Sequence, residues 1–164
     1  MNFRLSLSLA ATTLMLAGCG PDDMPDTAGP VVESMTPAPA AAPAVMRKAS
    51  PTGAMVYIVE PADGASVSSP VRVVFGLKGA GVAPAGIDLP NTGHHHLLID
   101  TELTRFDQPI PADAQHVHFG LGQTETTVEL APGRHELRLV LGDHLHIPHD
   151  PPIVSEVVTV EVMN

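Results

Sequence analysis

The stretch Gly93-His94-His95-His96-Leu97-Leu98-Ile99-Asp100 carries the strongest fold signal in this sequence. It reads as a β-strand, and side chains on a strand point alternately to its two faces. One face then carries His95, Leu97 and Ile99, and the other carries His94, His96, Leu98 and Asp100. We predict that the first of these faces meets the core, although Leu98 leaves the opposite assignment open.

Further strands are indicated on both sides of this stretch by short apolar or alternating segments between turn residues. The chain contains seventeen prolines and fourteen glycines, which favours many turns and little helix. The fold class predicted is all-β: an immunoglobulin-like antiparallel β-sandwich of about seven strands. Its strands are expected at residues 55–59, 71–78, 94–100, 116–119, 124–130, 135–141 and 153–162.

The chain before the predicted domain divides into two segments. Residues 1–18 have the charged start and short apolar run of a signal peptide, and residues 19–53 are rich in Pro and Ala without apolar periodicity. We therefore predict a disordered tether at 19–53 and a His-rich β-sandwich domain at 54–164. The sequence Leu16-Ala17-Gly18-Cys19 resembles the bacterial lipobox, which implies cleavage before Cys19 and lipidation of its thiol. The alternative is an ordinary signal peptide with a chance cysteine.

Charge and location narrow the class of partner. The net charge of −10 argues against nucleic acid or an anionic membrane surface as a partner, so membrane contact is expected only through the lipid. Cys19 is the single cysteine and excludes an internal disulfide. Gly20 follows it, which by resemblance to lipoprotein sorting signals implies the outer membrane. We expect the protein in the envelope of a Gram-negative bacterium, facing the periplasm.

All nine histidines fall at or after residue 94, and six of them form three His-x-His pairs. If the strands at 94–100 and 116–119 pair, up to four imidazoles converge on one sheet face. The segment 142–150 contains three more histidines and is predicted to be a loop, where functional groups are often placed. Imidazole is a common ligand of transition metals. The predicted metal ligands are His94, His96, His116, His118, His144, His146 and His149.

The remaining polar residues have other expected roles. His135 alternates with Leu137 and Leu139, which favours a structural hydrogen bond, whereas for His95 a structural and a ligand role stay open. Asp100 is interpreted either as a ligand or as a group that orients an imidazole. Imidazoles without cysteine suit Cu(II) or Zn(II), and an oxidising compartment favours copper. Because imidazole must be neutral to coordinate, binding is expected to weaken below about pH 6.

Four motifs resemble those of a bacterial family of exported domains of unknown function. They are Gly93–Asp100 (GHHHLLID), His118–Thr124 (HFGLGQT), Pro132–His135 and the GDHxHxPH motif at Gly142–His149. The resemblance covers about residues 54–164; it implies an exported β-sandwich domain and assigns no catalytic residue. A weaker resemblance links His94-x-His96-x3-Asp100 and Pro132-Gly133-x-His135 to the metal motifs of cupins. The chain departs from that pattern, because Asp100 stands where a glutamate is expected.

These observations favour a metal-binding lipoprotein that acts as a carrier, buffer or chaperone. One alternative is a metal-dependent envelope enzyme, cupin-like or other, although nothing in the sequence fixes an acid or base beside the metal. The other is a structural module in which the histidines form a buried polar network. We expect an enzyme less than a binding protein and assign no catalytic residue.

Overall fold

The computed structural model describes residues 45–164. The predicted signal peptide at 1–18, Cys19 and the tether as far as residue 44 lie outside them. The described part of the chain is built from strands and contains no helix. Its strands are β1 (Met55–Glu60), β2 (Ala65–Ser68), β3 (Val71–Lys78), β4 (Gly81–Val82), β5 (Thr92–Ile99), β6 (His116–His118), β7 (Glu125–Val128), β8 (Gly133–Gly142) and β9 (Val158–Met163). Within these residues, no helix is long and apolar enough to cross a membrane.

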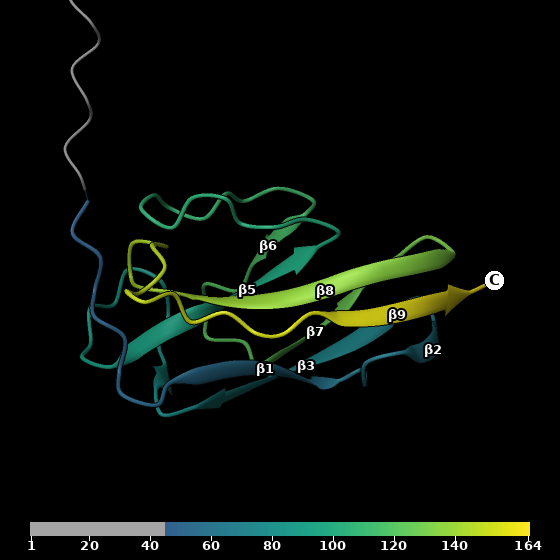
Figure 1. The fold of residues 1–164 in the computed structure, drawn as a ribbon, viewed down its shortest axis with the longest axis horizontal. Coiled ribbons are helices and arrows are strands. Elements are labelled where there is room, and N and C mark those ends of the chain that lie inside the picture. Colours follow the sequence, from purple (N-terminus) through teal and green to yellow (C-terminus); the bar gives the residue numbers. More distant parts are fainter. Residues whose placement is uncertain (1–44) are drawn as a thin grey trace, which may run out of the picture. The chain divides into compact units, whose positions relative to one another are not determined.

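The strands form two sheets that pack as a sandwich, which confirms the predicted fold class. One sheet has the order β1-β3-β7, and the other has the order β2-β9-β8-β5-β4 with β6 paired to β5 (Figure 1). Most neighbours are antiparallel; the short strands β2 and β4 pair in parallel with β9 and β5. β5 is central, because it pairs with β8 along one edge and with β4 and β6 along the other.

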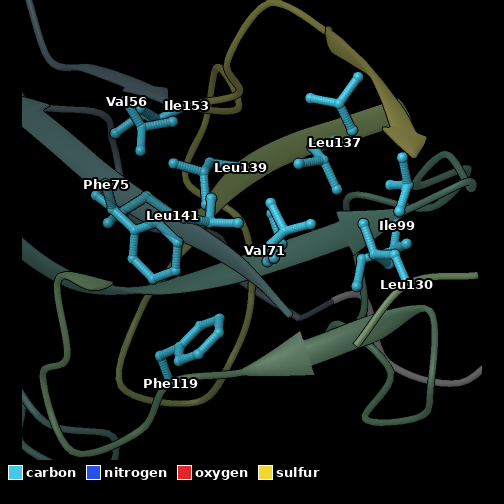
Figure 2. Close-up of a cluster of buried hydrophobic side chains, with 14 residues drawn as sticks. Val56, Val71, Phe75, Ile99, Phe119, Leu130, Leu137, Leu139, Leu141 and Ile153 are labelled. Carbon is cyan, nitrogen blue, oxygen red and sulfur yellow. The ribbon is translucent and has the colours of Figure 1, made fainter. Parts of the chain in front are cut away.

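The hydrophobic core lies between the two sheets and uses one face of each strand. Leu97 of β5 is part of it. Figure 2 shows Ile99 of β5 in the same cluster with Leu139 of β8 and Phe75 of β3. This confirms which face of β5 meets the core. Leu98 is equally buried on the opposite face, where it packs with Ile110 and Val140 in a second, smaller cluster.

The last predicted strand is shorter than expected. Residues 153–162 alternate well, yet β9 begins only at Val158, and the preceding residues lie along β8 with a single bridge between Val154 and Val140. The Ser155 side chain accounts for the interruption, because its hydroxyl accepts a hydrogen bond from the Leu139 amide at 2.9 Å. A side chain that occupies a ladder position competes with regular strand pairing.

Candidate metal centre

His94 and His96 form the floor of the site, and strand alternation places them there. They are two residues apart in β5, and both are fully buried on the face opposite Leu97. Their Nε2 atoms lie 3.1 Å apart. The sequence therefore predicted this pair correctly as neighbours on one face of one strand.

His118 joins them through the register of β6 on β5. It is the direct antiparallel partner of His96, so both side chains lie on the same face of the sheet. A ligand atom from each of His94, His96 and His118 lies within 4.8 Å of the other two. Gly120 leaves room for the third ring, since a Cβ there would be only 2.3 Å from Cε1 of His118. His118 is exposed, so the site opens to solvent on its side.

His146 closes the group from the turn that follows β8. The Asp143 carboxylate accepts hydrogen bonds from the amides of Leu145 and Ile147 at 2.8 and 2.9 Å, which folds residues 143–147 into a tight turn. His146 has a φ of 68°, a conformation that a non-glycine residue rarely adopts. In this conformation its ring centre lies 4.7 Å from that of His118 and 5.0 Å from that of His94.

The four rings are spaced as ligands of one ion would be. Their six centre-to-centre distances run from 4.7 to 5.9 Å. An imidazole nitrogen binds zinc at about 2.0–2.1 Å and the ring centre lies about 1.2 Å further, so four tetrahedral ligands place their ring centres about 5 Å apart. The His146 nitrogens are outside the group whose ligand atoms all lie within 4.8 Å of one another. The arrangement thus fits three imidazole ligands with a fourth ring adjacent.

Burial keeps the two floor imidazoles neutral. It lowers the pKa of His94 to about 4, with further lowering by the neighbouring His146 and His118 and a partial offset from Asp143. It lowers the pKa of His96 to about 2, assisted by the other three rings of the cluster. The pKa of His118 is also lowered, first by burial and then by His146. Since metals bind neutral imidazole, His94 and His96 are ready to coordinate at any pH near neutrality.

Each of these two imidazoles also has a buried nitrogen that makes no hydrogen bond within the described residues. Nδ1 of His94 and Nδ1 of His96 are buried and have no hydrogen-bond partner among the described residues. A buried polar atom without a partner costs about 1–3 kcal/mol of stability. The Nε2 of His95 and the Nδ1 of His149, which lie outside the cluster, also lack a partner among the described residues, so the close approach of the Nε2 atoms and not this feature distinguishes the cluster.

Three further predicted ligands lie outside the group of close ligand atoms. His116 is opposite Leu98, one step along the ladder from the site, and its Nδ1 lies 2.9 Å from the Asp113 carboxylate. His144 lies between two carboxylates, with Nε2 3.7 Å from Asp88 and Nδ1 3.9 Å from Asp143. His149 is buried elsewhere, without a partner for its Nδ1 among the described residues. His144 and His146 diverge because residues 143–147 form a turn, where residues two apart do not share a face.

Other polar residues have structural roles. His135 contacts the Asp100 carboxylate through Nδ1 at 2.6 Å and the Ala131 carbonyl through Nε2 at 2.9 Å, as its predicted structural role requires. The other oxygen of Asp100 accepts a hydrogen bond from the Glu136 amide. Asp100 therefore orients the His135 ring and is not part of the histidine cluster. His95 faces the core, where its ring contacts Phe75 and its Nδ1 lies 3.2 Å from the Gln123 carbonyl oxygen.

Two glycines shape the site and were missed as functional residues. A Cβ at Gly142 would lie 3.0 Å from Nε2 of His96, and the one at Gly120 would overlap the His118 ring. In the sequence Gly120 comes two residues after His118, and Gly142 comes two residues before His144. Glycine next to clustered ligands is a signal of close approach that sequence reasoning can use.

A family model described as a domain of unknown function (DUF4399) matches residues 73–163, which include the whole cluster. No curated protein matches the chain. Among solved structures, the fibronectin(III)-like modules of Clostridium thermocellum CbhA are similar at 16% sequence identity and a TM-score of 0.34. That match covers 73% of this chain and 47% of the other, so this chain spans less than half the length of that one.

Proposed function

This chain belongs to the DUF4399 family, a domain of unknown function, and from that premise we propose that it binds one transition-metal ion. The ligands proposed are His94, His96 and His118, with His146 as the fourth. The observation that carries the proposal is the 3.1 Å approach of two fully buried Nε2 atoms. In the metal-free protein one of these nitrogens can donate a hydrogen bond to the other, and one ion between them would replace that bond with two coordinate bonds.

The donor set favours copper or zinc as the ion. It consists of imidazoles, and the group of close ligand atoms includes no carboxylate or thiolate. Imidazole suits both Cu(II) and Zn(II), and at a given nitrogen site copper binds more tightly than zinc. We favour copper, because the chain carries an expected export signal and exported proteins meet an oxidising compartment.

The proposed role is that of a carrier, buffer or chaperone for the ion. Two ligands are buried and His118 is exposed, so an incoming or departing ion would pass on the side of His118. The expected lipid on Cys19 would hold the domain at the periplasmic side of the outer membrane, on the tether that follows it. Membrane contact in this proposal is made by the lipid alone.

Calorimetry on the protein lacking residues 1–19, without an affinity tag, tests the proposal. At neutral pH we expect uptake of about one Cu(II) or Zn(II) per chain, because one ion satisfies the three close imidazoles. Replacing His94 and His96 together with alanine should weaken binding by more than about 100-fold, since loss of even an outer-shell group costs 10–100-fold.

The matched control is His135→Ala, which removes an imidazole that lies on β8 with Asp100. It should leave the affinity unchanged. Circular dichroism confirms that each variant is folded. A folded wild-type protein that takes up no ion would refute the proposal, and so would equal losses in the double variant and the control.

A further inference from the structure

A short segment before the predicted domain boundary packs against the loop that carries His146. It consists of residues 47–50, which the sequence assigns to the tether. Ala49 forms a parallel bridge with Asp150, the Asp150 amide donates to the Lys48 carbonyl at 2.7 Å, and the Ser50 amide donates to the Asp150 carbonyl at 2.9 Å. The ordered fold therefore begins several residues before Ala54.

Arg47 makes the most extensive side-chain contacts of this segment. Its Nε donates to the Pro148 carbonyl at 3.0 Å, its Nη2 donates to the His149 carbonyl, and its Nη1 lies 3.0 Å from the Asp150 carboxylate. One guanidinium thus contacts three consecutive residues. Its side chain is only 18% exposed, so solvent competes little for these hydrogen bonds. The rigid fork of arginine donors suits such multiple contacts better than a lysine would.

Lys48 connects the same segment to a second loop beside the site. Its ammonium group pairs with the Asp88 carboxylate, whose other oxygen lies 3.7 Å from Nε2 of His144. The amide of Gly86 donates to the His144 carbonyl at 2.9 Å, which joins the two loops directly. The segment therefore holds the loop that carries His146 from one side.

The residues that Arg47 contacts close the turn that presents His146. Pro148 bridges Gly142, and the Asp143 amide donates to the Ile147 carbonyl at 2.9 Å. His146 itself has a left-handed backbone conformation, which is unfavourable for a residue other than glycine and persists only when the surrounding structure enforces it. The Ile110 amide supports it from the opposite side through the His146 carbonyl, at 2.9 Å.

We propose that residues 47–50 form a strap that positions His146 beside the other three imidazoles. This inference rests on the proposed metal binding at the cluster. Arg47 is the main positioning residue, since it fixes the chain that returns from His146 and does not itself reach the ion. Coupling between two sites is reciprocal, so a docked strap raises the affinity for the ion and a bound ion strengthens the docking of the strap. The start of the tether and the metal site thereby regulate one another.

Arg47→Ala is the test, with Arg72→Ala as its matched control. Arg72 also makes two ion pairs, with Glu60 and Glu125, but it lies on β3 in the other sheet. In the metal-free protein lacking residues 1–19, we expect Arg47→Ala to accelerate amide hydrogen exchange at residues 145–150 by about tenfold or more, because the loop loses its fixed partner. Arg72→Ala should leave that exchange unchanged.

The affinity for Cu(II) forms the second readout. Arg47→Ala should weaken it by about tenfold, in the range found for groups that orient a ligand. In a His146→Ala background the same substitution should have no further effect, because the residue it positions is gone. Electron paramagnetic resonance of the copper-loaded protein should show one fewer coordinated nitrogen in Arg47→Ala than in the wild type. Arg47→Lys keeps the positive charge but loses the forked guanidinium, so its affinity for Cu(II) should fall between those of the wild type and Arg47→Ala. This variant replaces Arg47→Ala in the test if the alanine variant does not fold.

The outcomes separate the strap from the metal site. If the wild type binds copper and Arg47→Ala changes neither exchange nor affinity, the strap inference is overturned and the proposed function stands. An affinity loss that is equally large without His146 also overturns it. If the wild type binds no metal, the proposed function fails and with it the coupling, while faster exchange in Arg47→Ala still supports the strap as the element that holds the loop.

Discussion

The two faces of β5 differ in chemistry although both are buried. On one face Leu97 and Ile99 pack into the main core between the sheets. On the other, His94 and His96 are as deeply buried as Leu97, yet each has a nitrogen without a partner among the described residues. Burial alone therefore does not distinguish residues that stabilise the fold from residues that serve a site.

This difference follows from alternation along one strand. Successive residues point to opposite faces, so the strand that anchors the core also fixes the two proposed ligands His94 and His96 with the rigidity of the sheet. Part of the outer face is covered, because Ile110 and Val140 pack around Leu98 in the smaller apolar cluster. Sites of this kind commonly cost stability in exchange for function.

The largest expected effect is a loss of stability caused by a substitution on the core face of β5. Leu97→Ala should lower the free energy of unfolding by about 2–5 kcal/mol, because it removes buried methyl groups and leaves a cavity. The copper affinity of the folded protein should stay as in the wild type. Chemical denaturation of the metal-free protein measures the first quantity, and calorimetry measures the second.

The neighbouring substitution His96→Leu sharpens this comparison. It replaces an incompletely satisfied imidazole with an apolar group, so the metal-free protein should keep its stability or gain about 1 kcal/mol. Copper binding should be lost. A large loss of stability in His96→Leu, or a loss of metal affinity in folded Leu97→Ala, would show that the two faces are not functionally separate.

A smaller effect is expected from pH on the metal-free protein. The pKa values of His94 and His96 are lowered on folding, so between pH 6.5 and about 4 the unfolded chain binds protons that the folded chain does not. Stability should therefore fall as the pH drops below 6.5, reaching its full loss for His94 near pH 4 and for His96 near pH 2. Denaturation at pH 7, 6 and 5 measures the slope.

The double variant His94→Gln, His96→Gln provides the reference for that slope and should show a shallower one. An unchanged slope would mean that these imidazoles titrate normally in the folded protein. Because the pKa values of His94 and His96 are lowered to about 4 and about 2, the proposed metal binding is expected to persist to a lower pH than the sequence alone predicts. The physical reason is burial, which a sequence pattern does not measure.

Much of the fold was predictable because it depends on local periodicity. Alternation identified β3, β5 and β8, and it correctly gave the core face of β5. The pairing of the His116–His118 segment with β5 enters the sequence-based prediction only as a condition, and the structure contains this pairing, with His118 opposite His96. Alternation along β5 thus predicted that His94 and His96 share one face.

The rest depends on features without a period. Register decides that His118 and not His116 reaches the site, and only the paired strands define register. The turn held by Asp143 decides that His146 and not His144 faces the cluster. The strap at residues 47–50 has no periodic pattern of polar and apolar residues that would predict a structural element. Its proposed role depends on contacts with residues about 100 positions away in the sequence.

X-ray absorption spectroscopy of the protein loaded with one Cu(II) or Zn(II) tests the central claim most directly, since it counts the imidazoles bound to the ion. The account predicts three or four imidazole nitrogens at about 2.0–2.1 Å. His118→Ala should remove one of them, and His116→Ala should remove none. A shell dominated by oxygen with one imidazole or none, or equal spectra for the wild type and His118→Ala, would contradict the account.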